Sequence, residues 1–484
     1  MKKCFLASLV LLIIALESHA QYFDNYYMLS NYHVNGSARY TAMGGAFGSL
    51  GVDPSSFHDN PAGIGKMVKS NISLSLGLYN NLSDNEINGQ KTNSLTTKLV
   101  VPDFAVSLLL PNSDYGKWKN MSFGLSSKRL LDFKRTNKYK NDNTNYNLSQ
   151  FFADDAFLVF DSDLADQLPF TSFLAFENYL INPDTVNYNT YTSEMQEEET
   201  NINFKENGRI QDWQFSFGAN YNNKLYLGAS FSYLTGSYNY TSEYIGTNKN
   251  SDTEDLQDYI YNFYYNSTID GVNLKLGAIY KLNQDLQLGA YYHSPSWYFI
   301  SETFDADLET NYRFENYYTE SPFEGFGEFR VNNPSRLGFS AAYTNPKVAI
   351  FSTEIVYNKQ SAGELLNLND TDFEINFDAD NNNIAQTLRD VWIIKVGIEK
   401  AFKPFALRLG TVYLPSGHNT SIPELNYNKL LFSGGLGFRF NGGYFDLALQ
   451  QQYSRSTYSS HAGADLGLSE NKGLNIMTTV GFRF

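Results

Sequence analysis

Most of the chain after residue 70 alternates apolar and polar residues. In the segment Leu225–Tyr233, which reads LYLGASFSY, every second residue from Leu225 onward is apolar or aromatic, and the residues between are mostly Gly and Ser. A period of two indicates a β-strand with one apolar and one polar face. The pattern predicts fourteen strands, near residues 70–79, 99–111, 119–134, 208–222, 224–241, 270–281, 285–298, 335–344, 347–359, 388–400, 404–414, 428–440, 443–456 and 473–484.

The predicted connections between these strands form two length classes. Six are tight and suit hairpin turns: Pro111–Lys117, Asn222-Asn223, Asn283-Gln284, Asn345-Pro346, Phe402-Lys403 and Asn441-Gly442. Seven are long and polar, near residues 80–98, 135–207, 242–269, 299–334, 360–387, 415–427 and 457–472. Short and long connections alternate along the chain. A sandwich has no reason to sort its connections this way, whereas a transmembrane barrel has short periplasmic turns and long outer loops.

The predicted fold class is therefore all-β, an antiparallel transmembrane β-barrel of about 14 strands. Apolar faces would meet lipid, polar faces would line the lumen, and closure would remove the exposed edges of the sheet. Aromatic residues cluster at strand ends, as in Trp297-Tyr298-Phe299. Interfacial girdles explain this clustering, and so in part does the β-propensity of aromatic residues. The final strand ends on Phe484, like the signal read by the outer-membrane barrel assembly machinery.

Composition and charge narrow the range of partners. The 484 residues are 16% aromatic and only 18% charged, and about 25% charged residues is usual in soluble domains. The net charge of −15 argues against nucleic acid as a partner, because phosphate binding needs clustered Lys and Arg. We interpret the acidic residues as solvated loop residues.

Residues 1–20 have the pattern of a secretory signal peptide. Lys2 and Lys3 precede the apolar run Phe5–Leu16, and Ser18-His19-Ala20 fits a cleavage site. The apolar run is too short to span a membrane as a helix. The single cysteine, Cys4, precedes that run, where no lipid anchor is expected. We therefore expect a mature chain that begins at Gln21 and leaves the cytoplasm without disulfides.

The segment Gly36–Gly65 differs from the rest of the chain. It reads GSARYTAMGGAFGSLGVDPSSFHDNPAGIG and is rich in Gly, Ala, Ser and Pro. Such a sequence predicts a compact piece with many turns. Because it has little apolar surface of its own to bury, it must pack against or inside something larger. We assign residues 21–69 to this N-terminal unit and residues 70–484 to the barrel.

The long connection 135–207 carries a pattern of its own. Phe151–Ile181 has apolar residues at roughly helical spacing, and acidic residues follow at Glu194–Glu199. This predicts one or two short amphipathic helices. Two interpretations remain open: the loop caps the mouth of its own barrel, or it offers an apolar docking surface outside the pore.

Catalytic and metal-binding patterns are weak. The five histidines of the expected mature chain, His33, His58, His293, His418 and His461, form no paired metal-ligand motif. The acidic segments Ser251–Asp258 and Asp370–Asp380 do not have EF-hand spacing. We predict no enzyme activity, no cofactor and no metal site.

Three motifs in the Gly-rich segment resemble the N-terminal hatch of FadL/TodX-type outer-membrane transporters of hydrophobic compounds. They are Ala42–Phe47 (AMGGAF), Asp53–Ser56 (DPSS) and Asn60–Gly63 (NPAG). Later segments are similar as well: Asn333–Gly338, Leu407–Gly410 and Gly435–Phe440. The resemblance covers the hatch and much of the C-terminal half, whereas residues 80–270 match only in strand pattern.

This resemblance implies a hatch that plugs the lumen and a passive route for apolar molecules. The substrate would dock in an outer apolar groove, enter a lumenal pocket, and leave through a wall gap made by a kinked strand when the hatch shifts. Eight residues would form and gate the hatch: Gly44, Gly45, Asp53, Pro54, Asn60, Pro61, Ala62 and Gly63. Expected partners are long-chain fatty acids or similar apolar compounds, outer-membrane lipid and lipopolysaccharide, and we expect a monomer.

Two arginines are candidates for contact with a ligand in the lumen. Arg408 and Arg439 lie on the polar faces of their predicted strands. They either hold a ligand carboxylate or pair with lumenal acids such as Glu399 and Asp446. The hatch has two interpretations as well, a moving gate or a fixed structural plug. The competing function is a structural or adhesive barrel with a static plug, and an outer-membrane hydrolase is a distant third.

Overall fold

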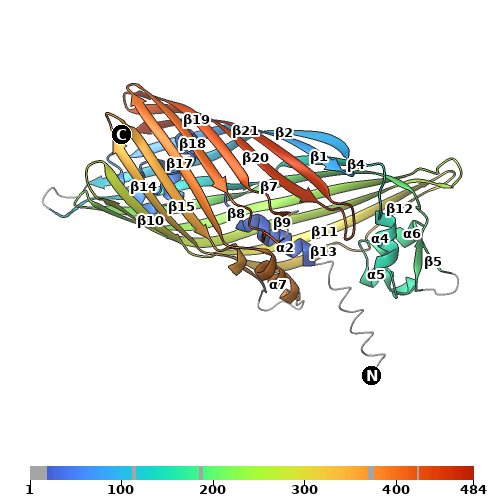
Figure 1. Ribbon diagram of the computed structural model, residues 1–484. Coiled ribbons are helices and arrows are strands. Elements are labelled where there is room, and N and C mark those ends of the chain that lie inside the picture. Colours follow the sequence, from blue (N-terminus) through green and yellow to red (C-terminus); the bar gives the residue numbers. More distant parts are fainter. Residues whose placement is uncertain (1–18, 112–115, 185–188, 369–374, 422–424) are drawn as a thin grey trace.

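The computed structural model describes residues 19–111, 116–184, 189–368, 375–421 and 425–484. Nearly all of the predicted signal peptide lies outside these ranges. The described residues form a closed antiparallel β-barrel of 14 strands (Figure 1), which confirms the predicted fold class. In this part of the chain, ten barrel strands run without interruption: β1 (Asn71–Ile87), β2 (Gln90–Pro111), β7 (Glu198–Tyr221), β8 (Leu225–Asn248), β9 (Leu256–Lys281), β17 (Val391–Phe402), β18 (Phe405–Leu414), β19 (Lys429–Phe440), β20 (Gly443–Tyr458) and β21 (Gly467–Arg483).

Four further strands of the barrel are each built from two pieces. The pairs are β3 (Trp118–Asp132) with β4 (Arg135–Asn141), β10 (Leu286–His293) with β11 (Ser296–Tyr312), β13 (Gly325–Asn333) with β14 (Arg336–Asn345), and β15 (Ala349–Asn358) with β16 (Glu364–Asn367). Pro295 and Pro334 lie in two of the breaks, where proline lacks the N–H that a ladder needs. A short strand, β12 (Asn316–Glu320), extends the sheet beside β11.

The first and last strands close the barrel. β1 pairs with β21 from Asn71 opposite Arg483 to Glu86 opposite Leu468. Side chains alternate as expected: Leu74 and Leu409 are about half exposed on the outer face, while Ser73 and Arg408 are buried inside. Among the described residues, no helix is long and apolar enough to cross a membrane.

The predicted outer loops are partly wrong. Residues 80–98, 242–269 and 299–334 were expected to be long loops, but most of them continue the strands, and β1 joins β2 through a turn at Asn88-Gly89. Above the apolar band, both faces of these strands carry polar residues, as in Asp84-Asn85-Glu86, so the alternation fades although the ladder continues. The strict alternation of short and long connections is therefore lost.

The tight connections that the structure describes are turns, as predicted. Asn222 and Asn223, between β7 and β8, both have positive φ values, 56° and 54°, which is the backbone of a type I′ hairpin. Asn283-Gln284 and Asn441-Gly442 join β9 to β10 and β19 to β20. Most of the predicted turn Pro111–Lys117 lies outside the described residues.

The N-terminal segment lies within the barrel. It contains α2 (His19–Ser30), α3 (Ala38–Ala42) and two 3-10 helices, η1 (Pro54–His58) and η2 (Pro61–Lys66). Tyr26 and Leu29 of α2 pack on inward-facing residues such as Leu234. Outside the strands, α7 (Asp378–Thr387) lies beside α2, preceded by η4 (Gln360–Ala362) (Figure 1).

The described residues of the segments 142–184 and 189–197 form an outer lobe at one end of the barrel (Figure 1), where they pack on β7, β8 and β9. It contains α4 (Leu148–Asp155), η3 (Asp161–Asp163), α5 (Leu164–Gln167), α6 (Ser172–Glu177) and the hairpin β5 (Ile181–Pro183) and β6 (Tyr191–Ser193). The short helices predicted for Phe151–Ile181 are present. Their apolar faces pack on Phe204, Tyr244 and Leu308, so the lobe caps the rim of the barrel, while Phe157 and Phe160 stay about half exposed.

Candidate functional site: a plug and a seam in the wall

The segment 36–66, called the plug below, fits tightly into the lumen near the short turns of the barrel. We call this end of the barrel the lower end. A Cβ placed on the strand residues Gly228, Gly277 or Gly410 would come closer than 3.0 Å to plug atoms of Pro61, Asn60 and Gly44, respectively. Strands on opposite sides of the barrel therefore approach the plug backbone directly, which only glycine permits.

Two related turns shape the plug. The side chain of Asp53 accepts a hydrogen bond from the Ser55 N–H (3.1 Å) and begins η1, whose first residue is Pro54. The side chain of Asn60 accepts one from the Ala62 N–H (3.0 Å) and begins η2 at Pro61. An Asx residue followed by proline is a favourable helix start. Asp53 and Asn60 of the predicted hatch are thus helix caps, and Pro54 and Pro61 are the first residues of the helices that they begin.

Asn60 and three glycines complete the plug. The Asn60 Nδ2 atom donates to the Gly48 carbonyl (2.6 Å) and to that of Ala278 on β9 (3.3 Å). Gly44 and Gly45 have φ values of 61° and 67°, so both need the left-handed conformation. Gly63 packs face to face with Gly51.

Buried charges fasten the plug to two sides of the wall, at β17 and at β3. Asp59 lies between Lys395 (3.2 Å) and Lys128 (4.0 Å), and Lys395 also binds Glu354 (2.7 Å). Burial alone would raise the pKa of Asp59, but Lys395 and Lys128 hold it well below its ordinary value. Asp59 is therefore a carboxylate that needs its cations.

His58 fastens the plug to β7 and, again, to β3. Its Nδ1 atom lies 3.0 Å from Asp212 on β7, and its Nε2 atom lies 2.9 Å from Ser126 on β3. Burial lowers the pKa of His58 to about 4, so the ring is neutral. Nδ1–H then donates to the carboxylate, and Nε2 accepts from the hydroxyl.

The two candidate arginines already have carboxylate partners. Arg408 is fully buried and binds Glu399 (2.6 Å) and Asp446 (2.8 Å). Arg439 is partly exposed and shares Asp446 (2.8 Å). Arg39 of the plug also binds Glu399 (2.9 Å). These contacts are the pairing with lumenal acids that the sequence left open, and they tie the plug to β17 and β18.

Between β2 and the strand formed by β3 and β4, part of the backbone ladder of the wall is missing. β2 pairs with β3 only from Asp103 opposite Lys128 to Pro111 opposite Asn120. Above that point, the ladder partners of residues 90–100 of β2 lie on β1 alone, and those of the paired residues between 129 and 141 lie on β7 alone. We call this interface between residues 90–102 and 129–141 the seam.

Side chains hold the seam together. Lys98 pairs with Asp132, the Thr136 N–H donates to the Thr96 hydroxyl (3.1 Å), and the Thr92 hydroxyl donates to the Lys138 carbonyl. On its outer face, Leu95 and Leu99 are 69% and 76% exposed, more than most apolar side chains of the barrel.

The plug meets the lower end of the seam. The Ser55 hydroxyl donates to Asp103 (2.8 Å), the last β2 residue of the ladder with β3. Pro102, just above, has no N–H, and β2 bulges there against Ser75 and Gly77. The lower end of the seam is therefore closed by the plug residue Ser55, which lies next to the bulge in β2.

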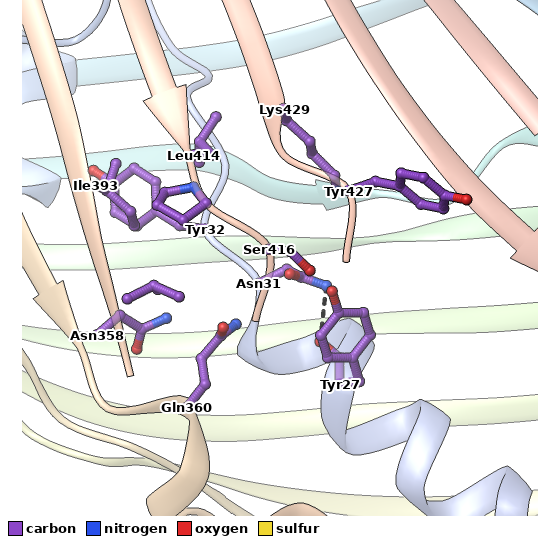
Figure 2. A pocket seen from close by; sticks show the side chains of 12 residues that line it. Tyr27, Asn31, Tyr32, Asn358, Gln360, Ile393, Leu414, Ser416, Tyr427 and Lys429 are labelled. Carbon is purple, nitrogen blue, oxygen red and sulfur yellow. Dashed lines mark hydrogen bonds between the residues drawn. The ribbon is translucent and has the colours of Figure 1, made fainter. Parts of the chain in front are cut away.

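Above the plug, α2 borders a small polar cavity near the upper ends of β15, β17, β18 and β19 (Figure 2). Tyr27 and Asn31 from the end of α2, Ser416 after β18, and Lys429 on β19 line it. The sequence patterns do not indicate this region, Asp59 or the seam, and they show His58 only as one of five histidines without a metal-ligand motif. Alternation places Lys395 on the inward face of its strand, but it reveals only that direction and not the partner.

No protein-family model matches this sequence, and no curated protein matches it. Among solved structures, the chain is similar to the P. putida toluene transporter TodX, with a TM-score of 0.53 and 14% identity over 94% of this chain and 99% of that chain. It is also similar to a Pseudomonas aeruginosa FadL homologue, with a TM-score of 0.55 and 13% identity over 94% and 99%. A third is the CymD monoaromatic hydrocarbon channel, with 0.51 and 12% over the same shares. These similarities confirm the predicted FadL/TodX-type resemblance at the level of the fold.

Proposed function

We propose that this chain is a passive transporter of hydrophobic molecules in a bacterial outer membrane, working like FadL/TodX-type channels. The seam beside the plug carries this proposal, because it is the part of the described wall that can open without breaking a backbone ladder. The neighbouring structures bear the names of toluene, monoaromatic hydrocarbon and FadL-type channels, which supports an apolar cargo.

The relative cost of two routes favours lateral exit. Straight passage through the lumen would remove the plug and break several buried ion pairs, and breaking one such pair costs about 3–5 kcal/mol. Lateral passage would part a few side-chain hydrogen bonds and one ion pair at the seam, each worth about 1–3 kcal/mol. An apolar molecule that reaches the membrane there gains about 0.8 kcal/mol for each methylene it buries.

The proposed route has three parts. The substrate docks at the exposed aromatic residues of the outer lobe, moves into the space beside α2, and leaves through the seam. The predicted gating residues Gly44, Gly45, Asp53, Pro54 and Asn60–Gly63 keep the plug as a floor, and η1 shifts, since its Ser55 hydroxyl donates to Asp103 at the end of the seam. Passage needs no energy input.

A disulfide across the seam tests this route. The only cysteine, Cys4, lies in the predicted signal peptide, so paired cysteines can be added freely. Thr96→Cys with Thr136→Cys joins the two sides, and Ile398→Cys with Leu409→Cys is the control, since these residues are already opposite each other in the β17–β18 ladder. Uptake of a labelled apolar compound is measured in cells with and without a reductant.

We expect oxidation to reduce uptake at least tenfold in the seam pair and reduction to restore it, with no change in the control pair. Full uptake through an oxidised seam would rule out the lateral route. Equal uptake of apolar compounds by cells with and without the protein would rule out transport itself.

One observation favours the competing adhesive function. Residues 142–197 contain ten Asp or Glu and no Lys or Arg, and Leu158, beside the exposed Phe157 and Phe160, has a positive φ of 69°. Strain of this kind is often kept for function. If removal of the lobe abolished surface binding of a partner and left uptake unchanged, the lobe would serve adhesion and not docking of cargo.

A further inference from the structure

A groove lies on the outer, membrane-facing wall of the barrel, over strands β3, β7, β8, β9 and β10. It has a volume of about 490 Å³, and its walls are almost wholly apolar. This volume is within the range of about 300–1,000 Å³ that is usual for small-molecule sites. Because the groove is outside the barrel, neither the plug nor α2 borders it.

The groove exists because a small residue interrupts a row of large ones. Strands β7, β8 and β9 lie side by side in the wall (Figure 1), and Ala229 of β8 points outward between Phe217 of β7 and Leu276 of β9. Phe231, the next outward residue of β8, is also large and 44% exposed. These larger side chains stand around the methyl group of Ala229, so the outer surface is hollowed there.

Two cations lie at the lower end of the same strands. Lys117 directly precedes β3, Lys224 lies in the turn between β7 and β8, and both side chains are exposed. The Asn222 N–H donates to the Lys117 carbonyl (2.7 Å), so the two turns are adjacent. In the part of the chain that the structure describes, neither lysine forms an ion pair with a carboxylate.

The distribution of charge favours a negatively charged surface at this end. Asp285, in the turn between β9 and β10, accepts a hydrogen bond from Asn345 (3.2 Å) at the end of β14. The acidic residues of the outer lobe lie at the opposite end of the barrel. The chain has a net charge of −15, yet the turns below the groove carry unpaired lysines, which attract anionic lipid head groups.

The distance from the cations to the groove fits a membrane lipid. Between them, the rings of Trp118 and Tyr221 lie 5.1 Å apart, and such aromatic pairs are typical of the level of the head groups. Lys224 and Ala229 are five residues apart, or about 17 Å along a strand. With a strand tilt of about 35–45°, this is about 12–14 Å across the membrane. One leaflet of the hydrocarbon core measures about 15 Å.

We propose that this face of the barrel is a binding site for a phospholipid with a net negative charge, from the leaflet at the lower end. Lys117 and Lys224 bind its phosphate, and one acyl chain fills the groove over Ala229. The surrounding lipid is as apolar as the groove, so the chain fixes the position of the lipid and the lysines select its head group. This site goes beyond the proposed transport, because it holds a component of the membrane and not the cargo.

Quenching of tryptophan fluorescence by brominated lipids tests the site. Trp213 is 39% exposed and is the next outward residue of β7 above Phe215, which lines the groove. Trp392 is 53% exposed on β17, on another side of the barrel. Variants that keep only one of these two tryptophans are placed in phosphatidylcholine vesicles containing phosphatidylglycerol or phosphatidylcholine with brominated acyl chains.

We expect brominated phosphatidylglycerol to bind beside Trp213 about fivefold more tightly than brominated phosphatidylcholine, because the two lysines attract the anionic head group. At Trp392, the two lipids should quench equally. Equal quenching by the two lipids at Trp213 would overturn the site, and this comparison does not depend on the folding of any lysine variant.

Paired substitutions test the lysines. Lys117→Gln with Lys224→Gln should reduce the preference at Trp213 to about one, because both charges are lost. The same change at Lys347 and Lys403, exposed lysines in the turns after β14 and β17, is the control and should leave the preference unchanged. A preference that survives the loss of Lys117 and Lys224 would contradict the assignment of the head group.

Filling the groove tests the position of the acyl chain. Ala229→Phe should reduce the quenching of Trp213 by both lipids, whereas Ala341→Phe, at an outward position of β14 between Phe339 and Tyr343, should not. Unchanged quenching in Ala229→Phe would overturn the placement of the chain. If Trp213 were shielded from both lipids in barrels that native mass spectrometry shows to be dimers, the groove would belong to a second copy of this chain.

Discussion

Two sides of the same barrel are built differently at the level of the plug. Along β17 and β18, the backbone ladder is continuous from Ile394 opposite Tyr413 to Phe402 opposite Phe405, and on its inner face Arg408 and Glu399 hold Arg39 of the plug. Along the seam, the ladder is missing and side chains replace it. One side of the wall is therefore joined by a continuous backbone ladder and the other by side chains, which is the difference that the proposed lateral passage would use.

The strongest test of the fixed side is removal of a buried cation. Lys395→Met leaves Asp59 and Glu354 without their shared partner, so we expect a loss of about 3–5 kcal/mol in the free energy of unfolding. The matched control is Lys472→Met, whose pair with Asp84 is about half exposed and worth less than about 1 kcal/mol. Urea unfolding in detergent, followed by tryptophan fluorescence, measures both. Equal losses would show that the plug does not depend on its buried charges.

The two arginines that share Asp446 give a finer comparison on the same side. Arg408 has no exposed surface, and Arg439 is 31% exposed. We expect Arg408→Met to lower the free energy of unfolding by about 2–3 kcal/mol, since two charged hydrogen-bond partners lose a donor. Arg439→Met should lower it by less than about 1 kcal/mol. The reverse order would contradict the roles assigned to this network.

Glycine contacts report how closely the plug fits. Gly228→Ala places a methyl group against Pro61, and we expect it to cost about 1–3 kcal/mol as overpacking. Gly434→Ala is the control, because its nearest neighbour lies at 3.5 Å, an ordinary contact. The same unfolding assay applies, and a stable Gly228→Ala protein would mean that the plug yields easily.

A substitution at the seam should have the opposite effect from one at the plug. It should change the stability of the protein little and the uptake of substrate clearly. Lys98→Met removes the ion pair to Asp132, which Arg129 continues to hold. We expect a stability loss of about 1 kcal/mol, because Asp132 keeps Arg129 as a partner, and faster uptake of apolar compounds. Slower uptake with the fold intact would show that Lys98 helps the substrate more than it holds the wall.

The sequence predicts the lower barrel well because apolar and polar faces alternate there strictly. β18 was expected at 404–414 and is found at Phe405–Leu414. Higher up, both faces are polar, so the extensions of β1, β8 and β9 were missed. The break at Phe133-Lys134 contains no proline or glycine to reveal it.

The sequence predicts only part of the candidate site, because it shows local contacts but not contacts between distant residues. Local motifs reveal contacts between residues that are close in the sequence. The helix starts at Asp53-Pro54 and Asn60-Pro61 are of this kind, since each capping side chain binds a residue two positions further on. Asp59 and Lys395 are 336 residues apart, and only the closed barrel brings them together. At the seam, two neighbouring strands form no backbone ladder. No residue type in the sequence marks such a missing ladder.

The closing ladder has a consequence for assembly. The plug precedes β1 in the chain, yet the Ala38 N–H donates to Thr479 on the last strand (2.7 Å). Strand glycines touch the plug too closely for it to be threaded into a finished barrel. The plug must therefore be in position before β1 meets β21, and the growing sheet wraps around it. In this order of folding, we expect the N-terminal segment to serve as a template and the C-terminal strand to complete the enclosure.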